Sequence, residues 1–222
     1  TNLDITGGTI RLDGDYPVGT NNVALGDAAM NSSISGNYNT ALGSFSMQPM
    51  TSASSNTGVG ASALRFVTSG SNNTAVGYVA LEDNDTGGSN TAVGKSALAN
   101  NTTANNNTAM GDSALITNVT GADNTAIGKS ALSANTVSNQ TAVGFKSLEA
   151  NTTGQPNTAV GAYALNANQT GAANTAVGFN AMGSSTSTGN VAVGHRALNS
   201  QTSGASNTAM GYQASYSNST GS

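Results

Sequence analysis

Apolar and polar residues follow a pattern that recurs every 16 or 17 residues from Asn22 to the end of the chain. The recurring unit reads Asn-Thr-Ala-Val-Gly-x-x-Ala-Leu, and a polar stretch that often reads Asn-x-Thr-Gly follows it. A fixed short period predicts one structural unit per copy, with each unit packed on the next. The twelve copies begin at Asn22, Asn39, Asn56, Asn73, Asn90, Asn107, Asn124, Gln140, Asn157, Asn174, Asn190 and Asn207.

The second to fourth positions of each copy predict a short β-strand, for example over residues 74–76. A helix is not expected, because a glycine and a polar turn sequence interrupt every copy. The fourth and ninth positions carry the largest aliphatic side chains, so we predict that these two columns form the interior. The predicted interior residues are Val59, Val76, Val93, Ile127, Val143, Val160, Val177, Val193, Leu64, Leu81, Leu98, Leu115, Leu132, Leu148, Leu165 and Leu198.

The fifth position is glycine in every copy. A glycine at a fixed place in each unit predicts a corner, where the backbone needs a positive φ or a close approach to the next unit. The predicted corner glycines are Gly26, Gly43, Gly60, Gly77, Gly94, Gly111, Gly128, Gly144, Gly161, Gly178, Gly194 and Gly211.

Strand, corner and polar turn together predict an all-β fold, a parallel β-solenoid of about twelve coils of 16–17 residues. Coils stacked at the spacing of strands in a sheet, ~4.8 Å, would form a rod of roughly 55–60 Å. Stacking also predicts side-chain ladders of asparagine and threonine along the rod. We divide the chain into a solenoid array at 22–222 and a unit at 1–21 that lacks the repeat.

The unit at 1–21 is expected to be a cap, a junction or an assembly strand. Four of its aliphatic residues flank a Gly-Gly pair that suits a tight hairpin turn. An exposed strand here could instead pair with a neighbouring molecule. The residues of this candidate assembly strand are Leu3, Ile5, Ile10 and Leu12.

Composition narrows the classes of function. Charged residues make up 7% of the chain, the net charge is −4 and no basic stripe occurs, which speaks against nucleic acid as a partner. There is no cysteine and no apolar run of about 20 residues, so we expect neither a thiolate metal site nor membrane insertion. No catalytic or metal-binding constellation is visible, and we expect a non-enzymatic protein without a cofactor.

Both faces of the predicted strand are apolar, with valine on one side and alanine on the other. A strand that is apolar on both faces needs cover on both. One face can fill the coil, and the other then needs a partner, so we expect a homo-oligomer.

The units at 73–81, 90–98 and 157–165 resemble the head repeats of the YadA-like trimeric autotransporter adhesins, and equally the repeats of bacteriophage tail fibres. The resemblance covers residues 22–222 and implies a left-handed trimeric β-roll. It implies an extracellular, cell-surface or virion-surface location and a role in attachment to a surface, a receptor or a cell-surface glycan. The polar half of each copy is longer than in that family. The sequence therefore does not decide between the same two-stranded roll and a wider, more triangular coil.

The sixth and seventh positions gather aromatic side chains towards the C-terminal end, and we name them as candidate contacts for a partner or for sugar rings. They are Tyr163, Phe179, His195 and Tyr212. His195 is the only histidine, and stacking predicts Phe179 and Tyr212 as its neighbours. Such neighbours favour a surface or interface role over a metal site.

Asn-x-Thr sequences at the twelfth position allow two interpretations, glycosylation acceptors or an asparagine ladder with threonine turns, and the second is preferred. For function, the leading hypothesis is a structural shaft or head of an extracellular fibre. The alternatives are a subunit that stacks end to end into a filament, and an ice-binding solenoid. Against ice binding, threonine shares a strand face with the valine that is predicted to be buried.

Overall fold

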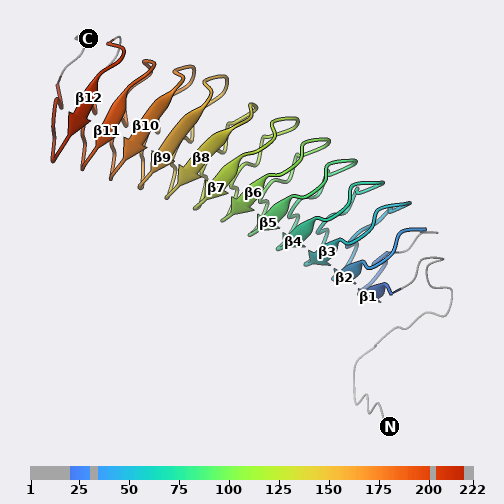
Figure 1. The fold of residues 1–222 in the computed structure, drawn as a ribbon. Helices are drawn as coiled ribbons and strands as arrows, with labels where there is room; N and C mark the ends of the chain where they lie inside the picture. The colour runs from blue at the N-terminus through green and yellow to red at the C-terminus, as the bar shows by residue number, and fades with distance from the viewer. Residues whose placement is uncertain (1–20, 31–34, 201–203, 218–222) are drawn as a thin grey trace, which may run out of the picture.

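A computed structural model describes residues 21–30, 35–200 and 204–217, and it is a parallel β-solenoid, as predicted. Twelve short strands, one from each copy, pair in chain order into a single parallel sheet along the rod (Figure 1). The described residues contain no helix. The strands are β1 (Val23–Leu25), β2 (Thr40–Leu42), β3 (Thr57–Val59), β4 (Thr74–Val76), β5 (Thr91–Val93), β6 (Thr108–Met110), β7 (Thr125–Ile127), β8 (Gln140–Val143), β9 (Asn157–Val160), β10 (Asn174–Val177), β11 (Val191–Val193) and β12 (Thr208–Met210).

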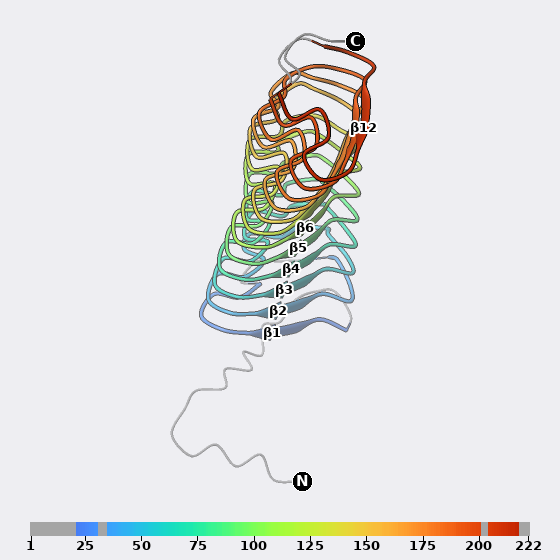
Figure 2. The ribbon, with the colours of Figure 1, turned by 90° about the vertical axis from the view of Figure 1, so that its left-hand side faces the viewer.

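Equivalent residues of successive coils lie opposite one another along the whole rod, as the loops in Figure 2 show. Thr74 pairs with Thr91, and the register survives both 16-residue steps, where Thr125 pairs with Thr141 and Thr175 with Val191. The missing residue is therefore absorbed in the polar half of the coil. The candidate assembly strand near the N-terminus lies outside the described residues.

All twelve corner glycines adopt φ between +127° and +141°, a conformation that other residues rarely reach. At eleven of them, all but Gly211, the next coil also leaves no room for a side chain: a Cβ on Gly128 would lie 2.5 Å from the Gly144 carbonyl oxygen. Both reasons predicted for this column, a positive φ and a close approach, therefore hold.

After the glycine, the chain leaves regular strand geometry but keeps its hydrogen bonds to neighbouring coils. The seventh and ninth positions both have left-handed backbone, with φ of 55° at Ser96 and 52° at Leu98. Ser96 N–H donates back to Tyr78 O at 2.9 Å, and Leu98 N–H donates forward to Ala114 O at 2.9 Å. Left-handed backbone costs roughly 1–2 kcal/mol per residue, and these contacts to the coils on either side offset that cost.

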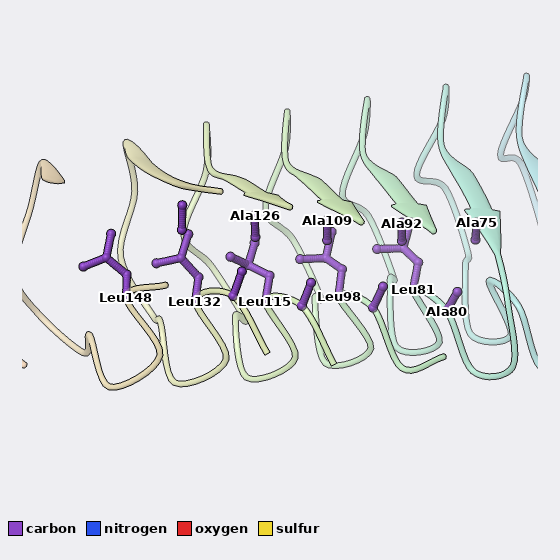
Figure 3. Close-up of a cluster of buried hydrophobic side chains, with 14 of the residues drawn as sticks. Ala75, Ala80, Leu81, Ala92, Leu98, Ala109, Leu115, Ala126, Leu132 and Leu148 are labelled. Carbon is purple, nitrogen blue, oxygen red and sulfur yellow. The ribbon is translucent and has the colours of Figure 1, made fainter. Parts of the chain in front are cut away.

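The interior is a narrow stack of alanine and leucine. Strand alanines such as Ala92 and Ala109 point towards leucines such as Leu98 and Leu115 from the opposite wall (Figure 3), and all four are fully buried. The eight predicted core leucines are buried throughout, with Leu198 the most accessible at 1%. This half of the core prediction is confirmed.

The other half of the core prediction is wrong, because the fourth-position side chains lie on the outside of the sheet. Alternation along the strand places the buried alanine inward and both of its neighbours outward. The inward position is alanine in eleven copies and glycine at Gly58, where a Cβ would lie 2.7 Å from Oγ of Ser46, which replaces an alanine of the opposite wall. The residues corrected from interior to outer face are Val59, Val76, Val93, Ile127, Val143, Val160, Val177 and Val193.

Asparagine at the first position satisfies the backbone inside the coil. Asn107 is fully buried; its Nδ2 donates to Gly121 O at 2.9 Å, and its Oδ1 accepts from the Asn124 N–H at 3.0 Å. Gln140 replaces asparagine in one copy and makes the equivalent bonds, from Nε2 to Gly154 O and from the Asn157 N–H to Oε1. Each such side chain closes its own coil and also links it to the next.

A second asparagine column, at the twelfth position, forms a side-chain ladder. Asn101 Nδ2 donates to Asn84 Oδ1 at 2.6 Å, and Asn168 Nδ2 donates to Asn151 Oδ1 at 3.1 Å. Because these side chains are buried, the folded coil leaves no room for a glycan on them. For the Asn-x-Thr sequences at this position that the structure describes, the interpretation as an asparagine ladder therefore holds. The buried members are Asn84, Asn101, Asn118, Asn151 and Asn168, whereas Asn218 lies outside the described residues.

The corner geometry makes a prediction with a control inside the chain. Gly128→Ala should lower the free energy of unfolding by about 2–6 kcal/mol, because it adds backbone strain and a clash with the next coil. In Gly211→Ala the φ strain is similar, but the nearest atom to the new Cβ is Ala214 Cβ at 4.0 Å. Denaturant unfolding followed by circular dichroism should show a clearly smaller loss for Gly211→Ala. Equal losses would mean that coil contact adds nothing.

The first-position asparagines make a second prediction. Asn107→Ala leaves the buried Asn124 N–H without a partner, at a cost of about 1–3 kcal/mol, whereas the Gly121 carbonyl loses one of two bonds and keeps the one from Asn118 Nδ2. Asn100→Ala, at an exposed position of the neighbouring coil, is the matched control and should change stability little. Thermal unfolding of both variants against the parent compares them directly. A similar melting temperature for all three proteins would contradict the role given to Asn107.

Candidate interaction surfaces

The outer surface of the sheet is a continuous face of threonine and aliphatic side chains, which we call the threonine–valine face. It comprises the second and fourth positions of all twelve copies, and none of these residues is charged. Threonine occupies the second position in every copy except at Val23 and Val191. The fourth-position column is Leu25, Leu42, Val59, Val76, Val93, Met110, Ile127, Val143, Val160, Val177, Val193 and Met210.

The threonine–valine face leaves much apolar surface in contact with water. Side chains in the middle of the rod such as Val76, Met110 and Ile127 are 37%, 42% and 37% exposed. Parallel sheets are normally covered on both faces, and contiguous exposed apolar surface marks interaction sites. In the single chain, this face of the sheet is uncovered.

A second surface is formed by five aromatic rings on successive coils at the corner beside the sheet, which we call the aromatic ladder: Phe145, Tyr163, Phe179, His195 and Tyr212. Tyr163 packs edge-on against Phe145 and Phe179, with centroids 5.2 and 6.0 Å apart. His195 lies stacked between Phe179 and Tyr212, at 5.4 and 5.0 Å.

All four aromatic residues singled out in the sequence belong to this ladder, and the neighbours predicted for His195 are the observed ones. Phe145 is the member that we did not single out. It occupies the same sixth position, one coil before the group begins, so the column itself carried the signal.

Polar and charged side chains lie next to the ladder at the seventh position. Lys146 is paired with Glu149 at 3.0 Å. Arg196 has no carboxylate at ion-pair distance within the described part of the chain. Arg196 Nε and His195 Nδ1 are shielded from solvent, and neither has a hydrogen-bond partner among the described residues. The ladder is thus an aromatic surface that covers two buried polar atoms without a partner in the described coils.

A smaller group lies on coils two to four. The Arg65 guanidinium lies 5.4 Å from the Phe45 ring centre, 4.8 Å from that of Phe66, and 3.8 Å from Glu82 Oε1. Partial burial, and next the charge of Asp83, raise the pKa of Glu82, while Arg65 opposes this shift. Every member of this group is already engaged with another, so we treat it as a surface contact that ties coils together.

The described residues offer no group of three or more histidine, aspartate or glutamate side chains placed to hold a metal ion. Within the same ranges, no helix is long and apolar enough to cross a membrane. Comparisons with family models, curated proteins and solved structures found no match for this chain. The fold and its two surfaces are therefore the basis for a functional proposal.

Proposed function

We propose that this chain is a non-enzymatic rod segment of an extracellular fibre, a shaft or head that serves attachment to a surface or host cell. The observation that carries the proposal is the threonine–valine face, an uncharged apolar stripe along the whole rod. In this proposal three copies pack side by side and cover that face. The resemblance of the repeats to YadA-like adhesin heads and phage tail fibres favours the trimer and a location on a cell or virion surface.

Parallel packing of identical rods suits this surface physically. Coils repeat at one spacing, so two copies aligned along their axes can bring equivalent aliphatic side chains together in every coil. Burial of such surface contributes roughly 25 cal/mol per Å² of apolar area. Because no charge lies on the face, self-association creates no buried ion.

The proposal predicts a fixed mass in solution. Light scattering over a hundredfold concentration range should give three times the 21.7 kDa chain mass, about 65 kDa, with short rods in negative-stain images of the same samples. A constant 21.7 kDa would contradict the trimer. A mass that rises with concentration, together with long filaments, would instead favour end-to-end stacking as the function.

The role of the face is tested by placing charges on it. Val93→Lys combined with Val143→Lys should reduce the mass to that of a single chain, because each lysine would be desolvated in the interface. Circular dichroism should stay unchanged, since both positions lie on the outer side of the sheet. Thr103→Lys, in an exposed polar turn, is the control and should remain trimeric. A trimer that persists in the double variant would place the interface elsewhere.

Ice binding becomes a second candidate for one specific reason. The argument against it assumed that threonine shares a buried face with valine, whereas that face is the exposed one. A regular two-column array of hydroxyl and methyl groups could then meet an ordered water lattice. Ice crystals grown with the protein would be shaped by a monomer that exposes the array, and Thr108→Lys would abolish that shaping. A stable trimer without any effect on ice would remove this candidate.

A further inference from the structure

We propose that the aromatic ladder and Arg196 form a binding site for an acidic polysaccharide strand that lies along the rod. The site deepens the attachment role proposed above by naming a ligand class and the residues that would bind it. It is separate from the threonine–valine face, because the corner glycines turn the chain between the two surfaces.

Ring geometry favours an oxygen-rich ligand over an apolar one. Phe179 and His195 are nearly parallel at 15°, and His195 and Tyr212 at 13°, each pair on adjacent coils. These three rings cover one another's faces along the rod and present their edges to the side, whereas Tyr163 contacts its two neighbours edge-on. Ring edges carry the positive end of the aromatic quadrupole, which attracts hydroxyl and carboxylate oxygens. Tyr212 is the most exposed ring of the ladder, at 73%, and an accessible aromatic face can stack on the apolar face of a sugar ring.

The charge distribution favours an anion at the same place. Residues 140–217 carry Lys146 and Arg196 against Glu149, a formal balance of +1. Residues 21–139 carry three basic and six acidic side chains, a balance of −3. A guanidinium without a protein carboxylate is suited to bind a carboxylate or sulfate through two hydrogen bonds. Arg196 is that group.

The same charges disfavour a second copy of this chain as the occupant. Two ladders placed face to face would bring Lys146 and Arg196 of both copies together, with only the Glu149 side chains to offset them. A linear polymer fits better in shape, because the rings follow the rod axis at centroid spacings of 5.0–6.0 Å over five successive coils. Sugar units of a chain laid parallel to the rod could contact successive coils, and contacts to several sites add avidity.

The test measures binding of the full chain to immobilised alginate, dextran sulfate and neutral dextran. The protein should bind one or both acidic polymers, with affinity that falls as salt rises, and should not bind dextran. Tighter binding to alginate assigns the anion to carboxylate, and tighter binding to dextran sulfate assigns it to sulfate. Equal binding to neutral dextran, no binding, or tighter binding to a single-stranded oligonucleotide would each overturn the proposal.

Variants with matched controls locate the site. Arg196→Gln and Phe179→Ala should each weaken binding about tenfold, and both use residues that the repeat already contains at those positions, at Gln213 and Ala162. The controls are Lys95→Gln and Tyr78→Ala, exposed sixth-position residues outside the ladder, which should bind like the parent. Equal loss in the controls would contradict the assignment.

Solution mass measured on the same samples separates this inference from the proposed function. Binding by a single chain would support the ladder site and contradict the trimeric rod. A trimer that binds no acidic polysaccharide would contradict the ladder site alone.

Discussion

The whole rod depends on one constraint, that neighbouring coils stay hydrogen-bonded in register around most of their circumference. The strand contributes bonds such as Thr74 N–H to Asn90 O at 2.8 Å, and the irregular half contributes bonds such as Phe66 N–H to Glu82 O at 2.8 Å. Because both halves bond to the adjacent coils, all coils must share one spacing. The glycine column follows from this, since at that spacing a Cβ at the corner would meet the next coil's backbone.

A fixed coil spacing also determines how polar groups in the interior are hydrogen-bonded. The interior holds one small residue from the strand against alanine and leucine from the opposite wall, which leaves little apolar volume per coil. Buried carbonyl and N–H groups near the polar turn must still be bonded, and the two asparagine columns provide those bonds. The bonding is incomplete at two places, Asn118 Oδ1 and Asn168 Oδ1, which have no partner in the described coils and each precede one of the two 16-residue copies.

The repeat period was enough to predict the solenoid, the corner glycines and the leucine half of the core. The prediction for the strand was wrong, because we assigned the fourth-position valines to the interior from their hydrophobicity alone. The signal that was overlooked is variation within the chain. The third position is alanine in eleven copies and glycine at Gly58, as a tightly packed site requires, whereas the fourth varies among valine, leucine, isoleucine and methionine. Left-handed backbone at Leu98 and its equivalents could not be foreseen, because leucine rarely adopts it.

The same distinction between constant and varied positions separates architecture from recognition. Columns that face the interior or the next coil allow few residue types, because a change in any one copy disturbs its neighbours. The sixth and seventh positions face outward, and they range from Asp112 and Lys129 to Phe179 and Arg196 without changing the coil. A binding surface can therefore be built on this rod only by choosing such residues in several successive copies. The aromatic ladder, which extends from Phe145 to Tyr212 across five coils, is a surface of that kind.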